Sequence, residues 1–273
     1  MNYRITKEVQ KNIVDYYLSR PMSLQECSNK FNLCKPTIAK VLNDNNIPRY
    51  SKNQIFNPNF DESYFETIDK EAKAYYIGFI ITDGNVHISS DKKANRQAMI
   101  SITQKENDAY ILQTFLDEVK SNRSVGHDGR GCCQCAVMSN KMADDLSKYG
   151  IVPRKTIYAY LPTFKKELMP HLIRGILDGD GNIKSKQTKR RHEHAVSFCG
   201  SHLLMEDIAN YLSEELGISK PNVYDYSDRQ LSEIKWQRKD EIHLIYNYLY
   251  NNASIFLKRK HDTFLAFEKY YNS

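Results

Sequence analysis

Apolar and polar positions along this chain follow a pattern that predicts both helices and strands. From about residue 73 onward, one order of elements is predicted twice: helix, strand, strand, helix, strand, strand, helix. In the first copy we expect strands near 85–90, 98–103, 124–128 and 133–138, with helices near 107–119 and 140–149. In the second copy we expect strands near 182–187, 193–199, 222–226 and 232–237, helices near 202–216 and 240–250, and a last helix near 257–271. Alternation within the strands predicts sheets with one face on a core and one in solvent.

The first helix of each copy carries the same short motif, at 76–84 and at 173–181. Each motif has two small residues four positions apart, which are Gly78 and Thr82 in the first and Gly175 and Gly179 in the second. Each motif ends in Asp-Gly, and the two aspartates are 97 positions apart, which indicates an internal repeat. Small residues at this spacing predict that the two helices pack backbone to backbone.

The aspartates, Asp83 and Asp180, come at the ends of these helices. A glycine follows each of them, and we expect it in the left-handed conformation that often ends a helix. A negative charge at a helix C-terminus has the wrong sign for the helix dipole. Close packing of the helices would bring these two carboxylates together, and a cation between them would offset their repulsion.

The two motifs and the repeated pattern behind them resemble the LAGLIDADG homing endonucleases in their single-chain, two-motif form. The resemblance covers residues 73 to 273, and we divide this part into repeats at 73–165 and 166–273. It implies an α+β fold of two pseudo-symmetric αββαββα repeats with saddle-shaped antiparallel sheets. It also implies a sequence-specific double-stranded DNA endonuclease of intron homing, which uses Mg²⁺ or Mn²⁺ to hydrolyse phosphodiester bonds. The expected partner is a long, non-palindromic duplex whose major groove the sheets read, bound by a monomer.

The resemblance assigns roles to residues around the motifs. Asp83 and Asp180 become the catalytic metal ligands, with the backbone carbonyls near Gly84 and Gly181 beside them, and oxygen donors of this kind suit Mg²⁺. A catalytic lysine near the end of each repeat corresponds to Lys155 and to Lys260, although a solvated surface lysine is the alternative for either.

A further catalytic position of the family, at the end of the second strand, is occupied by Gln104. Its aligned partner in the second repeat is Gly200, beside Ser201, so we expect unequal handling of water and slower cutting of one strand. Asp178 is also acidic, but its counterpart is Ile81, and we expect it to be peripheral.

Residues 1–50 predict a separate all-α unit. Thr6 opens an amphipathic helix, Ser23 and Glu26 form a capping box, and Pro36 stands in the first turn of a third helix. The order resembles small helix-turn-helix domains of recombinases and phage regulators, whose last helix enters the major groove. The residues expected to face DNA are Lys35, Thr37, Ala39 and Lys40. Arg49, just before a linker over 51–72, and Lys52, within it, are expected on the phosphate backbone. A plain helical bundle or a dimerisation unit is the alternative.

Charge supports an anionic partner. The net charge is +6, and residues 1–60 hold nine Lys and Arg against four Asp and Glu, while the remainder holds 30 against 29. Two basic clusters are expected between the first two strands of each repeat, formed by Lys92, Lys93 and Arg96 and by Lys184, Lys186, Lys189, Arg190 and Arg191. Their equivalent placement favours a surface that follows phosphates, and a solvated charge run is the alternative.

Other classes of protein fit less well. The six cysteines show neither zinc-site nor disulfide spacing, which favours a reducing compartment. No apolar run has membrane length, and the N-terminus does not begin like a signal peptide. We therefore expect no membrane partner and a cytoplasmic location in a bacterial or phage-infected cell. The alternative function is a non-cleaving transcription regulator or an RNA-binding intron maturase on the same scaffold, although such a protein has no need for two adjacent carboxylates.

Overall fold

The computed structural model describes residues 5–50, 52–89, 97–189, 191–226 and 231–272. The chain divides into two compact units. The first unit consists of Met1–Asp61 with Lys120–Asn122, and the second consists of Glu62–Val119 with Arg123–Ser273.

Four helices form most of the first unit: α1 (Lys7–Leu18), α2 (Leu24–Phe31), α3 (Lys35–Asp44) and α4 (Lys52–Phe56). The predicted starts of α1 and α2 are present, because Thr6 accepts a hydrogen bond from Val9 N and Ser23 from Glu26 N. The Glu26 carboxylate pairs with Arg20.

The first three helices enclose a small core. Its buried residues are Ile13, Tyr17, Met22, Cys27, Ile38, Val41 and Leu42. Asn32 ends α2 in the left-handed conformation, with φ at 51°, and so turns the chain sharply toward α3. The helices and the turn therefore lie where the sequence predicts them, while a DNA-binding role for α3 stays a prediction.

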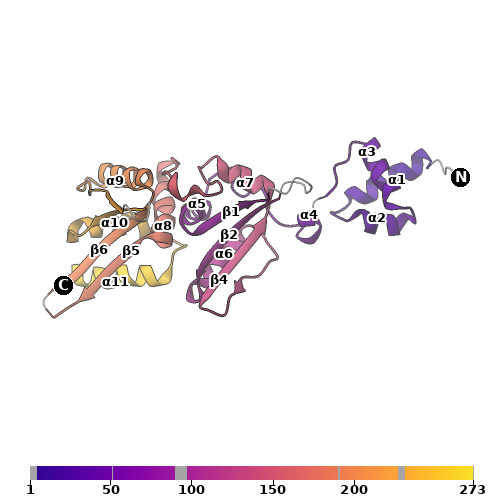
Figure 1. The fold of residues 1–273 in the computed structure, drawn as a ribbon. Helices are drawn as coiled ribbons and strands as arrows, with labels where there is room; N and C mark the ends of the chain where they lie inside the picture. The colour runs from indigo at the N-terminus through magenta and orange to yellow at the C-terminus, as the bar shows by residue number, and fades with distance from the viewer. Residues whose placement is uncertain (1–4, 51, 90–96, 190, 227–230, 273) are drawn as a thin grey trace. The chain divides into compact units, whose positions relative to one another are not determined.

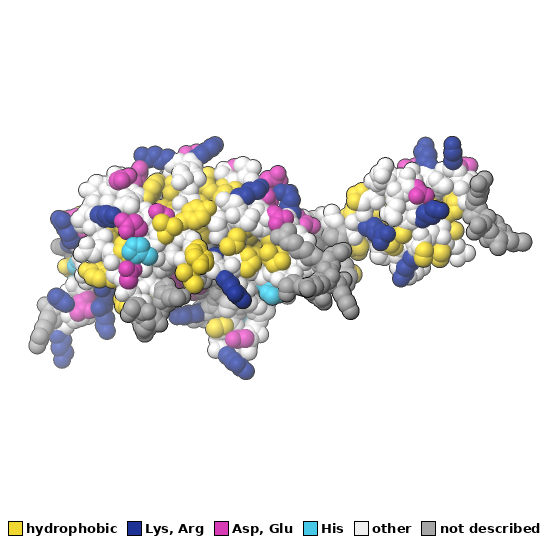
Figure 2. All heavy atoms as spheres, turned by 45° about the horizontal axis from the view of Figure 1, so that its top comes forward, with side chains coloured by type: hydrophobic (Ala, Val, Ile, Leu, Met, Phe, Trp, Pro, Cys, Tyr) yellow, Lys and Arg dark blue, Asp and Glu magenta, His cyan; other side chains and the backbone are white. Residues whose placement is uncertain are grey.

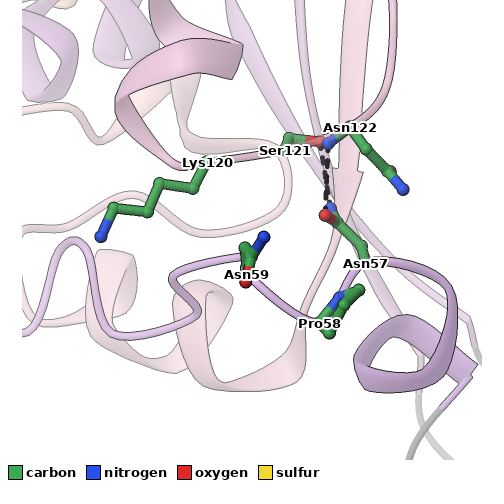
Figure 3. Close-up of a pocket in the computed structure, with 6 residues that line it drawn as sticks. All are labelled: Asn57, Pro58, Asn59, Lys120, Ser121 and Asn122. Carbon is green, nitrogen blue, oxygen red and sulfur yellow. Dashed lines mark hydrogen bonds between the residues drawn. The ribbon is translucent and has the colours of Figure 1, made fainter.

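Residues 57–59 and 120–122 line a shallow polar pocket in the first unit. Asn57 holds the two segments together, since its Nδ2 donates to Ser121 Oγ at 3.3 Å and its Oδ1 accepts from Asn122 N at 3.2 Å (Figure 3). The Asn57 amide thus joins the predicted linker to the 120–122 segment.

The second unit contains both repeats. Repeat 1 contains α5 (Glu71–Asp83), β1 (Gly84–Ile88), β2 (Ala98–Lys105), α6 (Ala109–Glu118), β3 (Gly126–His127), β4 (Cys132–Met138) and α7 (Asn140–Ser147). Repeat 2 contains α8 (Met169–Asp180), β5 (Asn182–Gln187), β6 (His192–Gly200), α9 (His202–Leu216), β7 (Tyr224–Tyr226), β8 (Leu231–Trp236), α10 (Lys239–Tyr250) and α11 (Lys258–Tyr271). Short 3₁₀ turns over 106–108, 155–157 and 166–168 complete the described elements. This element order confirms the predicted α+β fold of two αββαββα repeats.

The two antiparallel sheets have the same topology. Their strand orders are β1-β2-β4-β3 and β5-β6-β8-β7. Asn85 lies opposite Ser101 in the first sheet, and the equivalent Asn182 lies opposite Ser197 in the second, so the registers match just after the motif helices. In Figure 1, α5 and α8 lie side by side between the sheets. Each sheet buries one face in an apolar core, and none of the described helices combines the length and apolar character needed to cross a membrane.

Candidate active site at the interface between the motif helices

The motif helices α5 and α8 touch through their backbones. A methyl group at Gly78 would lie 2.1 Å from the carbonyl oxygen of Leu172, and one at Gly175 would lie 2.1 Å from that of Tyr75. These two contacts are related by the internal repeat. Neither position has room for a side chain, so the prediction of backbone-to-backbone packing is confirmed.

The next turn brings the ends of the helices together. A methyl group at Gly179 would lie 1.8 Å from Thr82 Oγ1 and 3.1 Å from Asp83 Oδ2. The carboxylate of the first motif therefore lies directly against the backbone of the second.

The glycines after the aspartates correct one prediction. Gly84 and Gly181 are extended, with φ at −86° and −79°, and neither is left-handed. Gly84 is the first residue of β1, and Gly181 immediately precedes β5, so the chain continues straight from each helix into the sheet. Glycine is needed here for space, because a methyl group would lie 2.5 Å from Ile80 Cγ2 at Gly84 and 2.4 Å from Leu177 Cδ1 at Gly181.

The two aspartates interact electrostatically. Burial and the negative charge of Asp180 raise the pKa of Asp83 to about 6, against the lowering effects of Lys260 and of a hydrogen bond from Gln104 Nε2. Partial burial also raises the pKa of Asp180, although this residue is more exposed than Asp83, while Lys260 and Lys155 oppose that shift. In the folded protein Asp83 therefore takes up a proton more easily than a free aspartate does. This is expected where two negative charges lie close together without a cation.

Both predicted lysines reach the ends of the motif helices. Lys155 and Lys260 are each only 5% exposed, which excludes a solvated surface role for either. Lys155 Nζ donates to Gly84 O, and Lys260 Nζ donates to Gly181 O at 2.6 Å, the equivalent atom of repeat 2. Burial lowers the pKa of each lysine to about 8, while Asp83 and Asp180 oppose the shift. Each lysine therefore places a cation at the negative end of a helix, beside the carboxylates.

The two sites differ in other polar groups. Gln104 reaches Asp83, whereas Gly200 gives Asp180 no such partner. Lys260 Nζ also donates to Leu177 O at 2.5 Å, to Asp178 O at 2.7 Å and to Gly179 O at 3.3 Å. Both sites thus have a lysine at the helix end, but in repeat 1 a glutamine also contacts the aspartate, and in repeat 2 the lysine contacts three further carbonyls.

Asp178 is not peripheral, which corrects a second prediction. Its fully buried carboxylate accepts hydrogen bonds from Tyr75 Oη at 2.9 Å, Tyr250 Oη at 3.2 Å and Leu257 N at 2.7 Å. Burial raises the pKa of Asp178, and the Lys260 ammonium and the hydrogen bonds from Leu257 N and Tyr75 Oη oppose that shift. The carboxylate therefore joins α5, α10 and the start of α11, the helix that carries Lys260.

Arg174 is a buried polar residue that sequence reasoning did not identify. Its guanidinium donates to Glu71 Oε1 at 2.6 Å, to the Leu249 carbonyl at 2.7 Å and to the Ile255 carbonyl at 2.8 Å. The only signal in the sequence is the mismatch between the repeats, because Ile77 and Ile81 stand where the second motif has Arg174 and Asp178.

The predicted DNA contacts occupy several surfaces. Lys35, Lys40 and Arg49 are exposed in the first unit, while Thr37 is half-buried, with its Oγ1 3.0 Å from Cys34 Sγ. Lys92, Lys93, Arg96 and Arg190 lie outside the described residues, as does the side chain of Lys52.

Part of the second basic cluster lies on a strand rather than in a loop. Lys184 and Lys186 belong to β5, and only Lys189 and Arg191 of the described members follow it. Lys184 pairs with Glu193 at 2.5 Å, and Arg191 approaches the same carboxylate at 3.8 Å. In Figure 2, basic side chains gather at the outer end of the β5–β6 hairpin, at the lower left.

The donors at the centre suit a hard cation. Asp83 and Asp180 interact there, and each is followed by a glycine whose carbonyl accepts a hydrogen bond from a lysine; carboxylate and carbonyl oxygens, completed by water and phosphate, are what Mg²⁺ prefers. In the described parts of the chain, no group of three or more His, Cys, Asp or Glu side chains could hold a metal ion. The residues therefore fit an ion shared with a substrate better than one enclosed by protein.

Known structures with this fold bind DNA. The meganuclease I-SmaMI, bound to uncleavable DNA, is 14% identical, with a TM-score of 0.53 over 74% of this chain and 89% of that one. The LAGLIDADG meganuclease I-AabMI, bound to uncleaved DNA, is 12% identical, with a TM-score of 0.54 over 75% and 91%. The I-LtrWI LAGLIDADG homing endonuclease, bound to target DNA, is 11% identical, with a TM-score of 0.53 over 74% and 90%.

Sequence comparison alone finds no relative. No protein-family model matches the chain, and no curated protein matches it. The likeness is therefore one of fold, reached at identities between 11% and 14%. With two motif helices in contact and one sheet on each side, this chain has the two-repeat fold of the single-chain LAGLIDADG homing endonucleases.

Proposed function

We propose that the protein is a divalent-metal-dependent endonuclease that recognises and cuts one long, non-palindromic site in double-stranded DNA. The observation that carries this proposal is the crowding of Asp83 and Asp180 at the ends of two packed helices, each beside a buried lysine. Repulsion between the two carboxylates lowers the stability of the metal-free protein. A cation bound between them, which could also bind a phosphate, would remove this repulsion.

The carboxylates of Asp83 and Asp180 would hold Mg²⁺ or Mn²⁺, with the carbonyls of Gly84 and Gly181 beside them. When bound, the metal supplies polarisation of the scissile phosphate and a water that loses its proton more easily. The residues of this chain do the rest. Gln104 fixes the orientation of the Asp83 carboxylate through its amide, and this orients the ligand before substrate arrives.

Lys155 and Lys260 act through charge. With a pKa of about 8, each lysine remains mostly protonated at neutral pH. Their hydrogen bonds to Gly84 O and Gly181 O keep each ammonium beside an aspartate, where it stabilises the negative charge that develops on the phosphate. One such set per motif gives one cutting centre for each strand of a duplex.

Both motifs belong to one polypeptide, so the enzyme acts as a monomer. The first unit extends the site, with α3 as the reading helix of a helix-turn-helix domain and Lys35, Lys40 and Arg49 toward DNA. Deleting residues 1–56 should shorten the protected site and lower the salt dependence of binding, because counterions released by this basic segment are lost. An unchanged footprint contradicts the role given to the first unit.

Selection of cleaved sites from a randomised duplex library tests the proposal. With Mg²⁺, sequencing of the new ends should give one long site with two unlike halves, and chelation by EDTA should abolish the ends. Selective binding without cleavage in any divalent metal would contradict the endonuclease and support the regulator or maturase.

A further inference from the structure

The outer faces of the two sheets can be compared position by position. In the first sheet Thr103 lies opposite Gln134, and in the second Cys199 lies opposite Glu233. Thr103 comes two residues after Ser101, which lies opposite Asn85, and Cys199 comes two residues after Ser197, which lies opposite the equivalent Asn182. Gln134 on β4 and Glu233 on β8 are therefore structural equivalents.

One outward position is the same in both repeats. Asn85 lies opposite Ser101, and Asn182 lies opposite Ser197, as the first outward pair after each motif helix. Both asparagine side chains are exposed. A duplex lying along the two faces would meet the same amide at equivalent places near its centre.

The third strands differ. β4 offers Gln134 and Ala136, whereas β8 offers Glu233 and Lys235 at the same places. Gln134 and Lys235 are exposed, and Glu233 is half-buried. One face therefore offers a neutral amide and a methyl group, and the other offers a carboxylate and an ammonium.

Local hydrogen bonds hold the two equivalent side chains in place. Gln134 Nε2 donates to Thr103 Oγ1 at 3.1 Å, which leaves its second N–H and its oxygen for a partner. Glu233 Oε2 accepts from Tyr226 Oη at 2.7 Å, which leaves Oε1. The first group can donate and accept together, as adenine N7 and N6 require, while the second only accepts, as cytosine N4 requires.

The Glu233 carboxylate on a DNA-facing surface indicates which base lies opposite it. A carboxylate repels phosphates and loses water when DNA binds, so it weakens binding unless a hydrogen-bond donor of the DNA contacts it. In the major groove the cytosine amino group is such a donor, and guanine O6 and N7 accept from lysine. Glu233 and Lys235, two residues apart on one strand, thus match neighbouring C·G and G·C pairs.

We propose that the two half-sites share an adenine preference next to the centre, through Asn85 and Asn182, and differ further out. The face of repeat 1 reads A·T through Gln134, and the face of repeat 2 reads C·G through Glu233 and a neighbouring guanine through Lys235. This inference rests on the proposed function, because it assumes that these faces lie in the major groove.

A reciprocal exchange tests the assignment. Wild type, Glu233→Gln and Gln134→Glu are each used to select bound duplexes from a randomised library without added metal, so that no cleavage is needed. Glu233→Gln should change one position from C to A, by about tenfold in relative affinity, and Gln134→Glu should change the equivalent position of the other half-site from A to C.

Gln113→Glu is the matched control, since it adds the same charge at an exposed position of α6, the helix whose buried side packs on the first sheet. It should weaken binding slightly and change no base preference. If the exchanges alter affinity equally for all sequences, the two residues do not read bases and the inference fails, while Mg²⁺-dependent cleavage by the same variants would leave the proposed function standing. Unselective binding by wild type would contradict both.

Discussion

The two repeats have one scaffold but use different polar groups at the site. Both have a glycine where the helices cross, an aspartate and a glycine at the helix end, and a buried lysine on the carbonyl that follows. They differ in the groups around this frame. Gln104 supports Asp83, whereas the Arg174 and Asp178 network holds the segment before α11 and thereby Lys260. The residues that the repeats share are those that close helix packing requires. The polar side chains that orient each aspartate and lysine differ between the repeats.

The largest expected effect is loss of cleavage from either aspartate. Asp83→Asn and Asp180→Asn should each reduce double-strand cleavage by about a thousandfold, because several kcal/mol of metal-supplied stabilisation is lost. DNA binding should change little. Cleavage of the selected site and a binding titration measure the two effects, with Asp262→Asn on the exposed surface of α11 as control. An aspartate variant that cuts at the wild-type rate removes that residue from the centre.

The lysines should differ in their contribution to stability. Lys260→Met removes four hydrogen bonds to backbone carbonyls and should cost about 3 kcal/mol, whereas Lys155→Met removes one and should cost about 1 kcal/mol. Denaturant unfolding of both variants compares the free energies directly. Equal losses would show that the additional contacts of Lys260 do not stabilise the fold.

The raised pKa of Asp83 predicts a stability that depends on pH. The folded state binds the proton more tightly, with a pKa of about 6 against an ordinary value of 3.8, so stability falls as pH rises between these values. Asp83→Asn should therefore stabilise the metal-free protein by about 2 kcal/mol at pH 7 and by much less near pH 4. Thermal unfolding in EDTA at both pH values measures the difference. A variant less stable than wild type at pH 7 contradicts the crowding of the carboxylates.

The smallest predicted effect concerns the balance between strands. Gln104→Ala removes a hydrogen bond that orients Asp83 and should change the ratio of the two strand-cutting rates by about tenfold. The variant should also cut best at a higher pH, because losing that hydrogen bond raises the pKa of Asp83 further. End-labelled strands in a single-turnover experiment report both rates, with Gln113→Ala on α6 as control. Equal slowing of the two strands would mean that Gln104 serves both centres.

Much of the fold could be predicted from local patterns in the sequence. Alternation of apolar residues located the strands, and small residues four positions apart predicted the contact between α5 and α8. The extended conformation of Gly84 and Gly181 could not be predicted, because it depends on the strand that follows. The burial of Lys155 and Lys260 could not be predicted either, since it depends on distant segments.

The partners of Asp178 explain why its role was missed. Tyr75, Tyr250 and Leu257 lie about 70 to 100 residues away in sequence, on three different elements. No periodicity relates them, and only the fold brings them together. Comparing the two motifs did mark the position, however, because a buried charge replaced an isoleucine at the equivalent place.

The central claim is that Asp83 and Asp180 together hold the cation that acts on DNA. Anomalous scattering from Mn²⁺ in crystals of the protein with its selected duplex tests this most directly. The account predicts a peak about 2 Å from an oxygen of each carboxylate, next to a phosphate at the cutting position, and its loss in Asp83→Asn. A peak elsewhere, with density from neither aspartate in contact, would contradict it.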